Sequence, residues 1–197
     1  MKPARFLARL FLIPAVAFLG GCVTHITTDI TQNPPPAEKF ANFTQFELKK
    51  ITLGAPYAGQ EANERAVAKI QENVSFKADS LVKGWNAKGA AVTPARTLVI
   101  APAIIEIKFI SGGSRFWAGA LAGSSAVILT AKITEKETGK EIANPMFYAR
   151  AAAMGGAWTF GGTDNAMLVR IAGRLTDYLA ANYETAVGGP TGAETTK

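Results

Sequence analysis

Apolar residues recur at two different periods along this chain, and the periods predict where its helices and strands lie. Within residues 60–88 the apolar positions are three or four residues apart, which places them on one face of a long helix. This stripe consists of Ala66, Ile70, Val74, Ala78, Leu81 and Trp85. A second stripe predicts a helix after residue 163, formed by Leu168, Ile171, Leu175, Tyr178 and Leu179.

Polar and glycine residues beside these stripes predict the helix boundaries. Asn63 is a candidate N-cap of the first helix, and Gly89 stands where that helix would end. Either Thr163 or Asp164 could cap the second helix, because both side chains can accept a backbone hydrogen bond.

Strands are predicted where apolar residues alternate with polar ones or form short continuous runs. Such segments lie within residues 46–53, 96–110 and 125–135. The second is apolar on both faces near its start, as in a central strand, but Pro102 indicates a bulge or an edge position. Residues 137–140 predict a hairpin turn, with Gly139 at a positive φ, into a last strand ending near Ala151.

The order of these elements predicts an α+β domain over residues 42–184. We expect one antiparallel sheet of about four strands with two helices packed on it. Residues 22–41 contain Pro34-Pro35-Pro36 and are expected to form a flexible tether. Such a tether could hold the domain up to about 60 Å from its attachment point, at ~3.3 Å per residue. Residues 185–197 are polar and glycine-rich, so we expect a disordered tail.

The first 21 residues are typical of a signal peptide. Lys2, Arg5 and Arg9 form a basic start, and an apolar run over residues 10–19 follows. This run is too short to cross a bilayer as a helix, which needs roughly 17–25 apolar residues. Pro14 also interrupts it.

The signal peptide ends at Leu19-Gly20-Gly21-Cys22, which resembles the lipobox of bacterial lipoproteins. The resemblance implies cleavage between Gly21 and Cys22, and a diacylglycerol with a further acyl chain on Cys22. Two or three acyl chains hold a protein stably on a membrane. In bacterial lipoproteins, an aspartate directly after the cysteine favours the inner membrane. This position is Val23 here, so the same resemblance implies the outer membrane. The open alternative is a secreted protein in which Cys22 is a free thiol.

Composition excludes several classes of function. The 197-residue chain has a net charge of +6, and about +3 remains after the basic leader is removed. Without a basic cluster that contains aromatic residues, nucleic acid is not an expected partner. The only histidine, His25, lies three residues from Cys22, which excludes a Ser-His-Asp triad, a Cys-His pair or a histidine-rich zinc site in the folded part. We expect no enzymatic activity, no cofactor and no metal.

Residues 112–125 form a glycine-rich segment that precedes the hairpin. The run from Gly113-x-Arg115 through Gly119 and Gly123, then a strand and the Glu137-Thr138-Gly139-Lys140 turn, is similar to a family of bacterial lipoproteins classed as a domain of unknown function. The resemblance implies a small α+β lipoprotein and brings no established activity. A nucleotide-binding phosphate loop is not expected, because no Lys-Ser/Thr pair follows the last glycine.

Three adjacent residues of this segment, Arg115, Phe116 and Trp117, are candidate contacts for a protein partner, since Arg and Trp are enriched at interface hot spots. The alternative, which we favour for Arg115, is hydrogen bonding to carbonyls of its own loop. A further alternative treats residues 116–131, which carry no charge, as a hairpin that inserts into the outer membrane.

Three acidic residues cluster around the predicted turn, namely Glu135, Glu137 and Glu141. We interpret them as a solvated hairpin tip rather than a catalytic pair. We therefore expect a lipoprotein of the outer membrane that faces the periplasm and acts as a non-enzymatic accessory module for an envelope protein. The alternatives are a carrier of a lipid or other apolar ligand, an oligomeric lipoprotein that inserts a hairpin, and a hydrolase using carboxylates alone.

Overall fold

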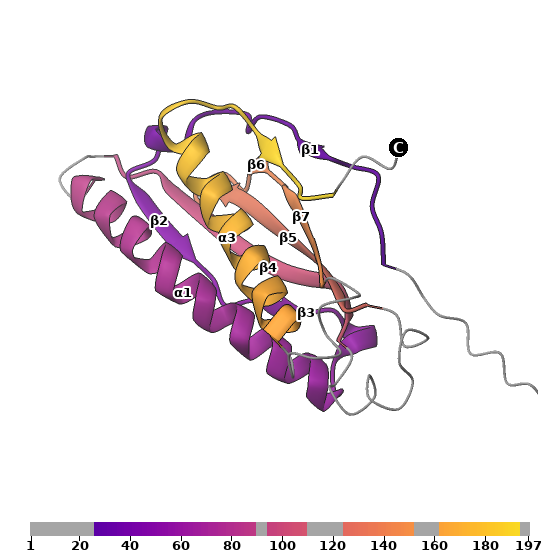
Figure 1. Ribbon diagram of the computed structural model, residues 1–197. Coiled ribbons are helices and arrows are strands. Elements are labelled where there is room, and N and C mark those ends of the chain that lie inside the picture. Colours follow the sequence, from indigo (N-terminus) through magenta and orange to yellow (C-terminus); the bar gives the residue numbers. More distant parts are fainter. Residues whose placement is uncertain (1–25, 90–93, 110–123, 152–161, 194–197) are drawn as a thin grey trace, which may run out of the picture.

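The computed structural model describes residues 26–89, 94–109, 124–151 and 162–193, and within them the chain forms a sheet with two helices on one face (Figure 1). The helices are α1 (Glu61–Gly89) and α3 (Gly162–Glu184), which pack against each other. Two short 3-10 helices, Phe40–Asn42 and Ala55–Tyr57, lie between the first strands.

The main sheet is four positions wide, and each outer position is shared by two short strands. Its strands are β2 (Gln45–Leu48), β3 (Thr52–Leu53), β4 (Thr97–Lys108), β5 (Ala126–Glu135), β6 (Glu141–Ala143) and β7 (Met146–Arg150). β4 and β5 are central and antiparallel, and β6 and β7 pair antiparallel with β5. β2 and β3 run parallel to β4 because α1 carries the chain back along the sheet between them.

The predicted α+β class is therefore confirmed, whereas the antiparallel sheet of about four strands was wrong. The sheet has six strands and mixed pairing. The predicted hairpin is present, with Gly139 at φ 71°, and its second strand is divided into β6 and β7.

The gap between β2 and β3 lies opposite Pro102. The carbonyl oxygens of Ile100 and Ile104 accept hydrogen bonds from the amides of Lys49 and Gly54, both at 2.9 Å. Backbone direction alternates along a strand, so the backbone of residue 102 also faces this edge. Proline has no N–H to offer, and the edge strand is interrupted there.

A bulge at Ile105 keeps one face of β4 apolar along its length. The register with β5 shifts between Ile104 and Glu106, and both Ile104 and Ile107 are buried in the core. Ile105 and Glu106 therefore both lie on the face away from the helices, where Ile105 is 44% exposed. The bulge or edge expected at Pro102 was misplaced, because β4 is central and its bulge is three residues further on.

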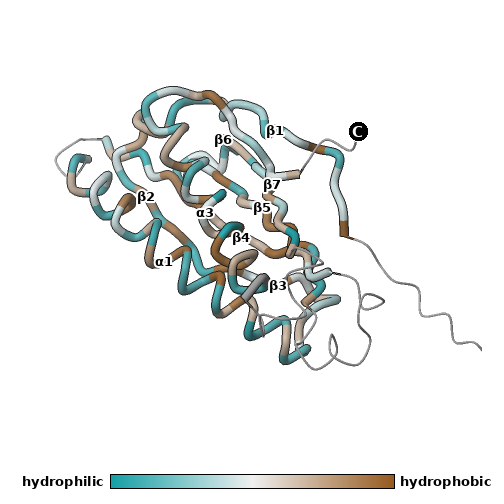
Figure 2. The backbone as a smooth tube through the Cα atoms, viewed as in Figure 1, coloured by the Kyte–Doolittle hydropathy of each residue, from teal (hydrophilic) through white to brown (hydrophobic). Residues whose placement is uncertain are grey.

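The hydrophobic core fills the space between the helices and the sheet. Its largest fully buried side chains are Phe40, Phe147, Ile70, Leu98, Ile100, Ile104, Leu129, Ile133, Met167, Leu168, Ile171 and Leu175. All five residues of the predicted α3 stripe are buried. In α1 the predicted stripe is also buried, except that Val82 takes the place of Leu81. Figure 2 shows the resulting alternation of hydrophilic and hydrophobic turns along α1.

The predicted helix boundaries need correction. α1 begins at Glu61, so Asn63 lies inside its first turn and donates to the Tyr57 carbonyl and to Gln60 Oε1, at 3.3 and 3.1 Å. Gly89 is the last residue of α1 rather than the residue after it. α3 begins at Gly162, which places Asp164 in its first turn rather than at its cap.

The expected tether and tail are instead paired with each other. β1 (Gln32–Asn33) and β8 (Gly189–Pro190) form a two-stranded antiparallel sheet. Phe40, within the expected tether, is fully buried in the core. Buried Asn182 holds the turn after α3 with four hydrogen bonds of 2.8–2.9 Å to the backbone of Tyr178, Val187 and Gly188. Residues 1–25, including the signal peptide and the start of the tether, lie outside the described residues, as do residues 194–197.

Candidate functional site

The predicted site residues all lie outside the described residues, namely Gly21, Cys22, Arg115, Phe116 and Trp117. The structure places the points where their segments join the domain. The chain that follows Cys22 enters the described part at Ile26, and residues 110–123 connect Phe109, after β4, to Ser124, before β5.

Ile26 is already packed on the sheet. It is 7% exposed and forms a small apolar cluster with Ala126, Ile128 and Tyr148. The Tyr148 hydroxyl donates a hydrogen bond of 3.1 Å to the Ile26 carbonyl. Ala126 and Ile128 alternate with core residues of β5, so this cluster lies on the sheet face opposite the helices. Three residues therefore lie between Cys22 and the packed domain, whereas the expected tether would place nineteen there.

The β7 edge of the sheet is covered by the first and last segments of the described chain. The Tyr148 amide donates to the Thr191 carbonyl at 2.8 Å, and the Thr191 amide donates to the Thr31 carbonyl at 2.9 Å. The Asn33 side chain bonds both backbone groups of Met146, at 2.8 and 2.9 Å. The backbone amides of Met146 and Tyr148 and the Met146 carbonyl are thus already hydrogen-bonded. These groups of β7 are therefore not free to pair with a strand of another protein.

The opposite edge is covered by side chains of α1. Asn86 accepts a hydrogen bond from the Phe46 amide at 2.6 Å and donates to the Phe46 carbonyl at 3.1 Å. Gln71 accepts one from the Ile51 amide at 2.8 Å, in the gap between β2 and β3. The helix therefore supplies the hydrogen bonds that a neighbouring strand would make.

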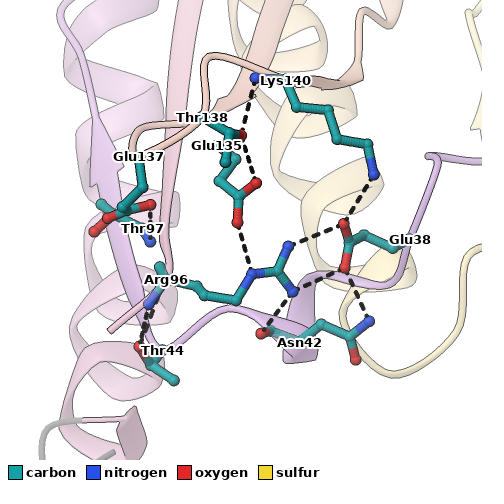
Figure 3. Close-up of polar contacts among 9 residues, drawn as sticks. All are labelled: Glu38, Asn42, Thr44, Arg96, Thr97, Glu135, Glu137, Thr138 and Lys140. Atoms are coloured by element: carbon teal, nitrogen blue, oxygen red, sulfur yellow. Dashed lines mark hydrogen bonds and ion pairs between the residues drawn. The ribbon is translucent and has the colours of Figure 1, made fainter. Parts of the chain in front are cut away.

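A polar cluster of described residues surrounds Arg96, just before β4 (Figure 3). Its guanidinium donates to both carboxylate oxygens of Glu38 at 3.0 Å, and its Nε donates to Glu135 at 2.6 Å. Arg96 also lies 4.4 Å from the centre of the Phe43 ring, in cation–π geometry. The cluster thus ties the segment before β2 to the hairpin end of β5.

These contacts favour the charged forms of the carboxylates. The hydrogen bonds from Arg96 lower the pKa of Glu38 to about 2. The Thr138 hydroxyl, and then Arg96, lower the pKa of Glu135. The Thr97 amide, bonded at 2.9 Å, lowers the pKa of Glu137. A general acid at neutral pH needs a raised pKa, so none of these three is suited to donate a proton.

The acidic trio of the hairpin is not a uniform solvated tip. Glu135 is buried and paired with Arg96, and Glu137 holds the Thr97 amide, while Glu141 is exposed. A second ion-pair group lies nearby, where Glu47 pairs with both Lys136 and Lys49. The trio therefore contributes to the structure of the hairpin end and does not converge as a catalytic pair.

The stretch proposed for membrane insertion is divided by the structure. Residues 126–131 belong to β5, which is paired with β4 on one side and β7 on the other. Residues 116–123 lie outside the described residues. Among the described helices, none has the length and apolar character required for a bilayer span. The described part also holds no group of three or more His, Cys, Asp or Glu placed to bind a metal ion.

The sequence analysis missed the residues that join distant segments. Arg96 and Glu38 are 58 positions apart, and Tyr148 and Ile26 are 122 apart. No local pattern links such pairs, because each member is an ordinary polar or apolar residue of its own segment. Only the Pro34-Pro35-Pro36 run marks the N-terminal segment, and its extended chain suits packing along a sheet as well as it suits a tether.

Comparisons with known proteins reveal distant similarity only. No protein-family model matches the chain, and no curated protein matches it in sequence. A Xanthomonas campestris protein of the DUF330 family is similar in structure, with a TM-score of 0.41 and 14% identity, over 80% of this chain and 94% of that chain.

Two further structures are similar. The PelC dodecamer of Paraburkholderia phytofirmans has a TM-score of 0.36 and 12% identity, over 71% of this chain and 91% of that chain. A candidate lipoprotein of Caulobacter crescentus has a TM-score of 0.33 and 12% identity, over 67% of this chain and 89% of that chain. These TM-scores are below 0.5, so the similarities carry no argument about activity or partners.

Proposed function

We propose that this protein is a lipid-anchored lipoprotein of the bacterial cell envelope whose folded domain is a non-enzymatic accessory module. The observation that carries the proposal is Leu19-Gly20-Gly21-Cys22, directly after a basic and apolar leader. Ile26 supports it, because a packed residue four positions after Cys22 suits a domain held close to its anchor. Val23 favours the outer membrane, with the domain in the periplasm.

The absence of enzymatic activity is part of the proposal. Its support is electrostatic, since the carboxylates of the Arg96 cluster have lowered pKa values and are engaged in hydrogen bonds. The space between the helices and the sheet is filled by buried side chains such as Ile70, Leu98 and Ile171. This filled core does not favour the alternative of an apolar-ligand carrier.

The proposed role of this module is to bind another protein of the envelope, with Arg115, Phe116 and Trp117 as its candidate contacts. The covered sheet edges support a partner that binds through side chains rather than by adding a strand. Crosslinking in the native host should capture such a partner, and replacement of Arg115 and Trp117 by alanine should reduce its yield at least about tenfold. An unchanged yield would reject this contact surface.

The lipid anchor is tested by mass spectrometry of the mature protein from its native host. We expect an N-terminal peptide that begins at Cys22 and carries a diacylglycerol and a further acyl chain. Cys22→Ser should remove this modification and release the domain from the membrane fraction, while Ser80→Ala, a change on the exposed side of α1, should leave both unchanged. A wild-type protein with a free Cys22 thiol in the aqueous fraction would contradict the proposal.

A further inference from the structure

The sheet has one face that the helices do not cover, and the N-terminal segment enters the domain across it. Ala126, Ile128 and Tyr148 lie on this face and bury Ile26. Their neighbours in the core, Val127 and Leu129, point to the helices instead. We call this face, opposite α1 and α3, the outer face of the sheet.

The chain between the anchor and the outer face is short. Ile26 is four positions after Cys22, and four residue steps of fully extended chain span at most about 14 Å. Ile26 cannot move away freely, because Tyr148 bonds its carbonyl and Thr191 bonds the chain at Ile30 and Thr31. Acyl chains on Cys22 would therefore keep this part of the sheet within about 14 Å of the lipid headgroups.

The chemistry of the outer face suits a headgroup layer. Its exposed side chains include the basic residues Lys132 and Arg150, on β5 and β7. Ile105 is 44% exposed on the same face, and Glu106 beside it is half-buried. Basic groups attract anionic headgroups, and a partly exposed isoleucine loses water contact against the layer.

We propose that the outer face of the sheet lies against the membrane surface, with α1 and α3 turned toward the aqueous compartment. This inference rests on the proposed lipid anchor at Cys22. The occupant of the face is the headgroup layer of the bilayer that holds the acyl chains. The helix layer is then the surface that remains accessible to proteins.

The test compares two labelled positions in the full mature lipoprotein on vesicles of phosphatidylethanolamine and phosphatidylglycerol. Because the chain has one cysteine and lipidation occupies it, a cysteine introduced by Lys132→Cys or Phe76→Cys is the only free thiol. Lys132 lies on the outer face, whereas Phe76 is 84% exposed on α1. A fluorophore is attached to each, and nitroxide headgroup lipids serve as quenchers.

The helix layer adds about 10 Å of thickness, so we expect at least about threefold stronger quenching at residue 132 than at residue 76. Insertion of ten Gly and Ser residues between Thr24 and His25 lengthens the chain between anchor and sheet, so quenching at residues 132 and 76 should become similar. Equal quenching in protein that floats with the vesicles would overturn the proposed orientation and leave the anchor intact. Protein that does not float, and has an unmodified Cys22, would contradict the anchor itself.

Discussion

At the scale of single residues, Arg96 and Glu38 join parts of the chain that are far apart in sequence. Glu38 lies in the Pro-rich segment, Arg96 stands at the start of β4, and Glu135 ends β5. A guanidinium holding two carboxylates, one of them through two parallel bonds, fixes the relative position of all three segments. The residues around it, Thr138 and Lys140, add further contacts to the same carboxylates.

The lowered pKa of Glu38 predicts a loss of stability in acid. Its value of about 2 in the folded protein lies below the ordinary 4.5, so the unfolded chain binds more protons between these values. This contribution is complete above about pH 4.5 and disappears as the pH falls through about 2. Glu38→Gln should lower the free energy of unfolding by about 1–2 kcal/mol at pH 7 and flatten its decline below pH 4.5.

Urea denaturation at several pH values measures both effects. Glu141→Gln removes an exposed carboxylate from β6, in the hairpin after β5, and controls for net charge. Equal slopes for wild type and Glu38→Gln below pH 4.5 would mean that Glu38 is not bound to Arg96 in solution.

At the scale of elements, the C-terminal part of α1 is positioned by contacts with β2 and with Thr44, the residue before β2. Asn86 satisfies the Phe46 backbone, and Trp85 packs against Phe46 and stacks on Tyr183 with ring centres 4.5 Å apart. The end of the helix approaches the main chain at Thr44 so closely that a Cβ on Gly89 would lie 1.9 Å from the Thr44 carbonyl oxygen. Gly89 is needed for this approach rather than for a positive φ.

Two glycines of α1 therefore predict opposite effects of the same substitution. Gly89→Ala should destabilise the domain by about 1–3 kcal/mol, because backbone must move to admit the methyl group. Gly84 has nothing within 4 Å of its Cβ position, so Gly84→Ala should stabilise by up to about 1 kcal/mol through helix propensity. Thermal and urea unfolding measure both, and a neutral or stabilising Gly89→Ala would show that α1 does not approach Thr44 this closely.

At the scale of the whole molecule, the two ends of the described chain act together. β8 pairs with β1, and Thr191 lies between β7 and the N-terminal segment. Asn182 determines the path that brings the chain from α3 to this position. The C-terminal segment therefore holds the segment that follows the proposed anchor, and its loss would lengthen the free chain between membrane and domain.

Asn182→Ala tests this coupling. It removes four hydrogen bonds of a fully buried side chain and leaves the amides of Val187 and Gly188 without their acceptor. We expect a loss of about 2–4 kcal/mol in the free energy of unfolding. Hydrogen exchange should also accelerate at the Thr191 amide, which donates to the carbonyl of Thr31 in the N-terminal segment.

The control is Asn73→Ala, in which the surface side chain on α1 donates one bond to the Lys69 carbonyl. It should change stability by less than about 0.5 kcal/mol and leave exchange at Thr191 unaltered. Unchanged hydrogen exchange at Thr191 in Asn182→Ala would show that the turn held by Asn182 is not coupled to the contact between Thr191 and the N-terminal segment.

The sequence by itself determined the elements whose residues repeat at a regular period. The stripe of α3, most of the stripe of α1, the alternation in β5 and the turn at Gly139 all follow from neighbours in sequence. The same holds for the lipobox interpretation of Cys22, which depends on four adjacent residues and the leader before them. Local order is sufficient there because each signal arises within one helix, strand or short motif.

Only the tertiary structure decided how the segments without a period are used. The Pro-rich segment and the polar tail lack enough apolar residues to fold alone, yet they pair with each other and cover the β7 edge. Parallel pairing of β2 and β3 with β4, the bulge at Ile105 and the Arg96 cluster likewise depend on contacts between residues far apart in sequence. These contacts form between backbone groups and charges that still lack partners once the core has formed. Which groups those are depends on the whole fold, so no single stretch of sequence reveals it.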